Sequence, residues 1–369
     1  MRFCAQIAEK SGYTVAGITA AYGISGIPGI ISFGLCMLLF ANPQSKLIFD
    51  WRLSLGSKTL RISLILRALS FVALVWGVKH TSLGFMLLGA ALSGLFVGLF
   101  WPTFYTMKKE EVGGWFVFEK TSGVMLIIST GVLLVYANLL WILLVSLLAT
   151  LLSFAYTFRI SGDLVQQYST PPISFTHLSK PRNIAFLDGA IGESLRMIRR
   201  LALLSGTVTL LGMEGVLSFA LVLAVSEAGG AILSKMAWFD PIHYIALALS
   251  AAAICILGPE FWLYGLLLMG VSLSALFPLI QKEVKAQLDL AGATDLNFRE
   301  RKRSQGRAVG AIFASAVFLL PLPLEIVFLG IILALAALAQ CSENLFPPRG
   351  SSNGTPKNTF YSIISNLNG

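Results

Sequence analysis

Charged residues are scarce in this sequence. Asp, Glu, Lys and Arg make up 12% of its 369 residues, whereas a soluble globular domain carries about 25%. Hydrophobic residues make up 56%, and the mean hydropathy is +0.78. Water does not solvate so much apolar surface, which excludes an ordinary cytosolic enzyme, a disordered chain and, despite the net charge of +9, a nucleic-acid-binding domain. About 11 spans of ~20 residues would account for nearly all of the apolar content.

Cysteine and histidine are also few, and neither is clustered. The four cysteines form no Cys-x-x-Cys pair, and the three histidines lie far apart. This spacing argues against a disulfide framework and a zinc site, so we expect neither metal nor cofactor. A phosphate-binding loop is lacking too, because the nearest match, Gly114–Thr121, has Glu119 where the second glycine must stand. We therefore expect no ATP hydrolysis by this chain.

Long apolar runs follow one another in a repeated order. The first run has 29 residues without a charge, too long for the core of a cleavable signal peptide, and we interpret it as one retained span. The runs expected to cross once are Tyr13–Ala41, Leu60–Val78, Leu83–Thr106, Met213–Leu233, Pro241–Leu257 and Phe261–Leu279. Two longer runs fit two spans each: Ser122–Phe158, hinged near Asn138, and Ala308–Ala339.

The order of long and short loops is the same in both halves of the chain. The sequence therefore predicts an all-α polytopic membrane protein with two pseudo-repeated helix bundles and about 11 transmembrane helices. We expect an N-terminal bundle over 1–158, a cytoplasmic linker over 159–183, a C-terminal bundle over 184–340 and a disordered cytoplasmic tail over 341–369. Basic loops alternate with very short turns, which places the N-terminus outside and the C-terminus inside.

One segment decides this topology. Ile184–Gly206 carries Glu193 and three arginines, yet we expect it to cross the membrane. Otherwise the second half inverts, and the basic loop Lys282–Arg307 faces outward. The alternative is an amphipathic helix lying on the cytoplasmic face, followed by one tilted span over Leu201–Leu233.

A loop motif carries a family resemblance. The arrangement of spans resembles the major facilitator superfamily, whose loop between the second and third helices runs Gly-x3-Asp-Arg/Lys-x-Gly-x-Arg/Lys-Arg/Lys. Asp50, Arg52, Gly56 and Lys58 match this motif in a stretched form without the leading glycine. Such groups at helix ends can pair across two bundles and latch one conformation. The alternative is that the basic residues only set the topology beside anionic lipid.

The resemblance covers about residues 13–340 and implies an alternating-access carrier. Gly94 and Pro102 recur at one offset as Gly270 and Pro278, in agreement with an internal repeat. The first half offers no counterpart to the family's first helix. We therefore expect a 12-helix carrier architecture from which the first helix is missing or truncated.

Ionisable residues within the spans are the candidates for chemistry, because such groups are costly in lipid. Glu193, Arg196 and Arg200 are spaced i, i+3, i+7 and share one helix face. Facing a cavity, they would bind an anionic solute, with Glu193 neutralising one arginine; otherwise the arginines extend to the headgroups. Arg67, about two turns into its helix, is expected to pair with an acid or to extend likewise.

Two further carboxylates flank the core of one span. Glu214 and Glu227 are candidates for carrying a proton through a transport cycle. The alternatives are an outer-end residue in water for Glu214 and an ion pair with Lys235 for Glu227.

The leading functional hypothesis is a secondary transporter of a small solute, with an anion favoured by the arginines. The alternatives are a membrane-embedded enzyme acting on lipid-linked substrates and a non-transporting scaffold or truncated relative. We expect a monomeric multi-pass protein of an inner or plasma membrane, in contact with lipid and without a nucleic-acid partner.

Overall fold

The computed structural model has only helical elements in the residues that it describes. These are residues 4, 7–50, 57–107, 138–158, 215–233, 241–290 and 296–320, with scattered positions in 125–130 and 186–211 and at 326 and 329. The all-α class is confirmed for this part of the chain. By length and composition alone, four described helical stretches are long and apolar enough to cross a membrane, namely Ser11–Ala41, which a kink divides, Lys58–Lys79, Leu83–Trp101 and Leu139–Thr157. The total number of spans stays a prediction.

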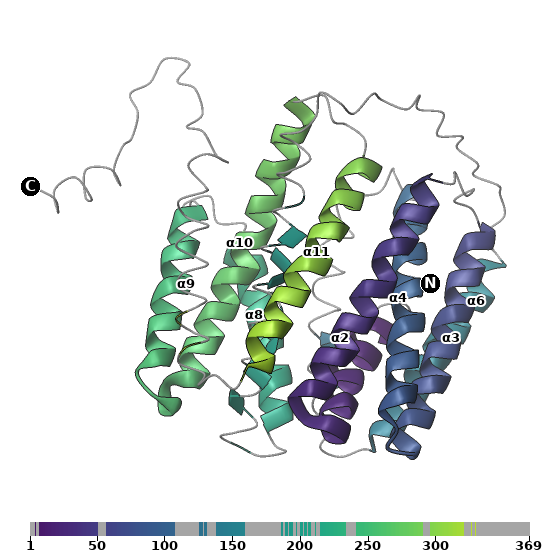
Figure 1. Ribbon diagram of the computed structural model, residues 1–369, viewed down its shortest axis with the longest axis horizontal. Helices are drawn as coiled ribbons and strands as arrows, with labels where there is room; N and C mark the ends of the chain where they lie inside the picture. Colours follow the sequence, from purple (N-terminus) through teal and green to yellow (C-terminus); the bar gives the residue numbers. More distant parts are fainter. Residues whose placement is uncertain are drawn as a thin grey trace, which may run out of the picture.

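The described helices stand side by side as a bundle (Figure 1). In chain order they are the π-helical η1 (Ile7–Gly17), α2 (Ile18–Asp50), α3 (Ser57–Lys79), α4 (Leu83–Met107), α6 (Leu139–Thr157), α8 (Gly215–Leu233), α9 (Pro241–Ile256), the 3-10 turn η4 (Pro259–Phe261), α10 (Trp262–Leu290) and α11 (Leu296–Leu319). Figure 1 places α8, α9 and α10 on one side, α3, α4 and α6 on the other, and α2 beside α11 between them.

The first apolar run forms a helical hairpin. The ring centroids of Tyr13 and Phe33 lie 5.9 Å apart, whereas 20 residues of uninterrupted helix would separate them by about 30 Å. Gly29 likewise packs against the backbone carbonyl of Ala21. The prediction that Tyr13–Ala41 is one span is therefore wrong, and the argument for a missing first helix loses its basis.

The turn of this hairpin lies within α2. Ser25 and Gly26 have non-helical backbone angles, and the φ of +62° at Gly26 is one that glycine adopts readily. Pro28 follows at the start of the returning segment, where its missing N–H costs nothing. The hairpin directs the beginning of η1 toward the same side of the bundle as Asp50, whereas one straight span would place the two on opposite sides. Which of these sides faces the cytoplasm stays a prediction.

A helix begins at the hinge expected near Asn138, while residues 131–137 lie outside the described part of the chain. Asn138 has an extended backbone and precedes α6, and its side-chain oxygen accepts a hydrogen bond from the Leu140 backbone N–H at 3.0 Å. This is an N-cap, which satisfies one of the free donors at a helix start.

The same helix packing recurs in the two halves of the chain. α4 packs against both α2 and α3, and α10 packs against both α8 and α9. In each half a glycine allows two helices to approach each other closely. Gly94 lies against the backbone of Met37, and Gly230 lies against Ser274. Such recurrence is expected of an internal repeat. The boundaries assigned to the bundles stay predictions, because 159–183 and 341–369 lie outside the described residues.

Among the described helices that have labels, two contacts join the halves of the chain. In one, α2 packs against α11. In the other, Val15 of η1 is buried in one apolar cluster with Ile127 and with Ala220 and Ala224 of α8. Both junctions are built from apolar side chains of helices far apart in the sequence.

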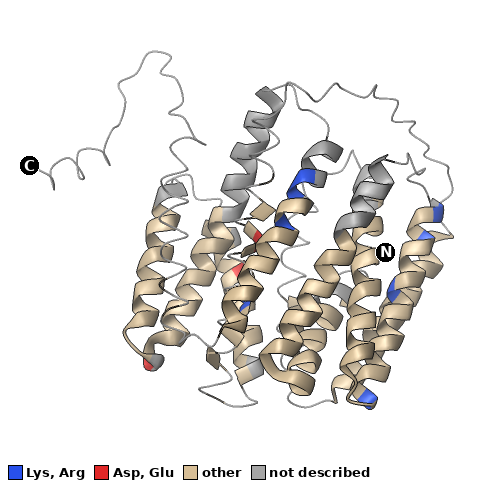
Figure 2. Cartoon of the chain, in the orientation of Figure 1, with Lys and Arg blue, Asp and Glu red and all other residues tan. Residues whose placement is uncertain are grey.

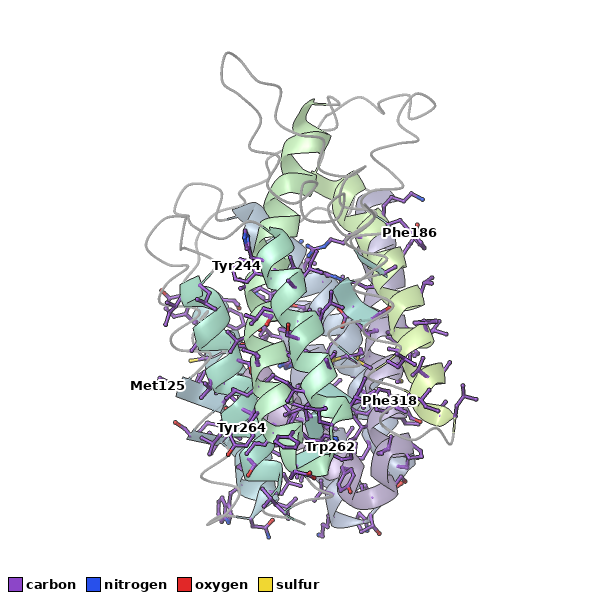
Figure 3. All side chains as sticks on the ribbon, turned by 90° about the vertical axis from the view of Figure 1, so that its left-hand side faces the viewer. Met125, Phe186, Tyr244, Trp262, Tyr264 and Phe318 are labelled. Atoms are coloured by element: carbon purple, nitrogen blue, oxygen red, sulfur yellow. The ribbon has the colours of Figure 1, made fainter. Side chains whose placement is uncertain are left out.

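The distribution of polarity is that of a protein surrounded by lipid. On α6, Trp141 and Leu148 are 65% and 57% exposed, whereas Ser146 and Thr150 are buried. Both hydroxyls donate to a carbonyl one turn earlier in their own helix. Met125 and Tyr264, labelled in Figure 3, are also largely exposed. A water-soluble bundle would show the reverse arrangement.

Candidate functional site

The segment expected to cross the membrane packs along α11. Every described residue between 186 and 211 is helical. Gly306 lies against Phe186 and Ala190, and one turn later Gly310 lies against Ala190 and Ser194. Later residues of α11 therefore contact later residues of the segment, which means that the two helices run in the same direction.

The far end of this segment reaches the opposite end of the bundle. Gly206 lies against Leu266 and Trp262, the latter being the first residue of α10. Gly189, by contrast, lies against the backbone of Arg303 near the start of α11. Because α10 ends where α11 begins, these two levels lie at opposite ends of the bundle. This path is the one predicted for a crossing segment and differs from that of a helix lying flat on the surface.

One face of the segment points at the first half of the chain. A Cβ atom at Gly34 of α2 would lie 3.3 Å from Cε of Met197. Glu193 precedes Met197 by one turn and Arg200 follows it by three residues, so all three share a face. Glu193 is 6% exposed and Arg200 is partly buried. The structure thus places a carboxylate and a guanidinium group at the junction of the two halves. Arg196 lies outside the described residues.

A third charged residue near this junction was missed by the sequence analysis. Arg303 is 8% exposed, and its backbone meets Gly189, one turn before Glu193. The basic loop expected at Lys282–Arg307 includes this residue, but α10 continues to Leu290 and α11 begins at Leu296. That prediction is wrong because a basic run at the end of a membrane helix can continue the helix into the aqueous phase. The helical spacing of Arg303 and Arg307 was the available signal.

The remaining predicted site residues are only partly described. Glu227 lies on α8 and is partly buried, whereas Glu214 lies outside the described residues. Of the loop motif, Asp50 ends α2 and Lys58 is exposed at the start of α3, while Arg52 and Gly56 lie outside the described part. The motif does connect α2 to α3, but the latch stays a prediction.

Arg67 lies in a buried cluster of aromatic and hydroxyl side chains. The guanidinium carbon lies 4.3 Å from the ring centroid of Tyr13 and 4.5 Å from that of Phe96, and 5.2 Å from that of Phe71. Its Nη1 donates to Ser93 Oγ at 3.0 Å. We call these five residues the Arg67 cluster. Figure 2 shows that most of the described ribbon is tan, with few blue or red segments within the bundle.

The cluster explains how an arginine is tolerated at this depth. Arg67 is 1% exposed, so the expectation that it extends to the headgroups is wrong. A cation at the centre of a membrane helix costs about 2.5–3.5 kcal/mol, and each cation–π contact returns roughly 0.5–2 kcal/mol. The Tyr13 hydroxyl in turn donates to the Gly89 carbonyl at 2.8 Å and is hydrogen-bonded to Ser70. Sequence alone does not reveal this cluster, because its partners lie on three separate elements.

Solved transporters share this architecture. The nucleoside transporter NupG aligns with a TM-score of 0.63 at 12% identity, over 94% of this chain and 97% of that chain. A POT family transporter in complex with 5-aminolevulinic acid aligns with a TM-score of 0.62 at 11% identity, over 93% and 96% of the two chains. No protein-family model and no curated protein matches the sequence. The chain therefore has the fold of these solved transporters, in agreement with the resemblance to the major facilitator superfamily stated from the sequence.

Proposed function

We propose that this protein is a secondary active transporter that moves a small solute by alternating access between the two halves of its chain. The observation that carries the proposal is the charged face of the segment 186–211. Glu193 and Arg200 flank Met197, which meets Gly34 of the other half. Charged groups at this depth are costly, and those that a chain retains usually serve a function. Their position at the junction means that a relative movement of the halves changes their surroundings.

A solute with a carboxylate or phosphate group fits this face best. Arg196 and Arg200 would attract the anionic group, and Glu193 would neutralise one guanidinium when the site is empty. NupG is a nucleoside transporter, and the POT family transporter holds 5-aminolevulinic acid, which carries a carboxylate. We therefore expect this chain to prefer 5-aminolevulinic acid over an uncharged nucleoside.

Proton coupling is the second part of the proposal. Glu227 on α8 and Glu214 just before this helix are the candidate carriers, because a carboxylate in a low-dielectric site can gain and lose a proton as its surroundings change. The transporter would function as a monomer in an inner or plasma membrane. The loop residues Asp50, Arg52, Gly56 and Lys58 would latch one of its conformations.

Uptake into proteoliposomes tests the proposal. The purified protein is reconstituted, and the entry of radiolabelled 5-aminolevulinic acid, a dipeptide and uridine is followed with and without an imposed pH gradient. We expect saturable uptake of the two carboxylate-bearing solutes, driven by external acid, and a lower rate for uridine. Glu227→Gln should abolish the response to the pH gradient while leaving exchange of solute intact.

Variants of the charged face complete the test. Glu193→Gln, Arg196→Ala and Arg200→Met should each lower kcat/KM at least about tenfold, which corresponds to about 1.4 kcal/mol. Glu260→Gln is the matched control, because Glu260 is exposed in the turn between α9 and α10. Uptake at the wild-type rate in all three variants would rule out the proposed site. Absence of uptake of all the solutes tested would count against the transport function.

A further inference from the structure

The Arg67 cluster joins three helical elements. Tyr13 comes from η1, Arg67 and Phe71 come from α3, and Ser93 and Phe96 come from α4. α3 and α4 follow each other through a short turn and pack along their length. Only η1 reaches the cluster from a separate part of the chain. The cluster therefore joins η1 to the α3–α4 pair, while η1 also packs against α6 and α2.

The opposite side of η1 meets the other half of the chain. Val15 is fully buried and packs in one cluster with Ile127, Ala220 and Ala224. Two residues correspond to roughly half a helical turn, so Tyr13 and Val15 project from opposite sides of η1. The element is thus held between the Arg67 cluster and α8. A displacement of Tyr13 also displaces the surface that α8 contacts.

Side-chain contacts with neighbouring helices position η1. Its residues are π-helical from Ile7 to Gly17, and long runs of this conformation are rare because the helix is less favourable than an α-helix. An element of this kind holds its place through side-chain contacts with its neighbours. Tyr13 supplies several of these contacts: its ring packs on Phe33 and Phe71, and its hydroxyl bonds to the Gly89 carbonyl.

We propose that Arg67 is a positioning residue for transport, which holds η1 against α3 and α4 so that the three elements move as one body against α8. The inference rests on the transport function proposed above. Arginine suits this task because a planar guanidinium lies between two rings while an N–H group bonds to a hydroxyl. An apolar side chain of similar length fills the same space without attracting the ring faces.

Arg67→Met separates positioning from a purely structural role. Replacing a buried charge by apolar atoms of similar volume commonly leaves stability unchanged or raised. We expect the variant to keep or raise the melting temperature while its maximal uptake rate falls about tenfold and its KM changes less than about threefold. Uptake at the wild-type rate, or a melting temperature that falls together with the rate, would overturn the positioning role.

Two substitutions of Tyr13 provide matched comparisons. Tyr13→Phe keeps the ring over Arg67 and should retain most of the uptake rate, whereas Tyr13→Leu should lower the rate as Arg67→Met does. Because both residues act through one contact, the double variant Tyr13→Leu/Arg67→Met should be no slower than either single variant. Additive losses would show that the two residues act independently, which contradicts the proposal.

Cross-linking provides a readout that needs no known solute. After the native cysteines are replaced, Val15→Cys is paired with Ala220→Cys, and the rate of oxidative cross-linking is measured in membranes. Arg67→Met should lower this rate at least about threefold, whereas Tyr13→Phe should leave it unchanged. Equal rates in all variants overturn the positioning role whether or not the protein transports. A lowered rate in a protein without any uptake supports the positioning of η1 and counts against the transport function.

Discussion

The hydroxyl of Ser194 donates a hydrogen bond to the carbonyl oxygen of Gly310, 116 positions later in the sequence, over 3.0 Å. The same hydroxyl donates to the Ala190 carbonyl at 2.7 Å. The contact joins α11 to the segment that carries Glu193, and it is short because Gly310 has no side chain. The position of the charged face therefore depends on the absence of a Cβ atom at this site.

Gly310→Ala should consequently destabilise the protein. The added Cβ would collide with the backbone carbonyl of Ala190, which cannot rotate away. Forcing an extra methyl group into a packed contact costs about 1–3 kcal/mol. We expect the variant to have a lower melting temperature in detergent. This temperature is measured by fluorescence-detected size-exclusion chromatography of heated samples.

Gly84→Ala is the control for this measurement. A Cβ atom at Gly84 would meet only the Ser82 hydroxyl, at 3.8 Å, which is an ordinary van der Waals distance. Its melting temperature should match the wild type. Equal melting temperatures for Gly310→Ala and Gly84→Ala would argue that the segment does not pack on α11.

The hairpin in the first apolar run makes a second prediction. Gly29→Ala should lower the yield of folded protein and its melting temperature, because the new Cβ would meet the backbone carbonyl of Ala21 across the hairpin. Gly23→Ala should be neutral, since no atom lies within 4 Å of that position. If residues 7–50 formed one straight helix, the two substitutions would behave alike and both would be tolerated.

The hairpin also illustrates where sequence analysis succeeds and fails. The spans expected at Leu60–Val78 and Leu83–Thr106 agree with α3 and α4 within three residues, because charged or turn-forming residues interrupt the apolar runs there. The turn at Ser25 and Gly26 carries no charge, so hydropathy continues across it without a break. The sequence Ser25-Gly26-x-Pro28 contains the turn signal, but in lipid such residues also occur within helices.

The candidate site was also predictable only in part, because the local sequence shows helix faces but not the contacts between distant helices. The helical spacing of Glu193 and Arg200 indicates a shared face from sequence alone. That this face meets Gly34, and that Arg303 lies nearby, depends on contacts between residues more than 100 positions apart. The environment of Arg67 depends likewise on rings contributed by η1 and α4, so its burial was not foreseeable from the local sequence.

The orientation in the membrane makes a third prediction. In a variant without native cysteines, Ser304→Cys in the first half of α11 should react with an impermeant maleimide only from the cytoplasmic side, because basic segments are retained there. His80→Cys lies in the exposed turn between α3 and α4 and should react only from outside. Labelling of Ser304→Cys in intact cells would overturn the topology.

Alternating access at the junction of the two halves is tested most directly by a cross-link between Gly34→Cys and Met197→Cys. The two positions meet in this structure, and a short bifunctional thiol reagent would hold the charged face against α2. We predict that the cross-link stops the uptake of carboxylate-bearing solutes and that a reductant which cleaves the reagent restores it. Each single-cysteine variant treated in the same way should keep its rate. Uptake at an unchanged rate in the fully cross-linked protein would contradict movement at this junction.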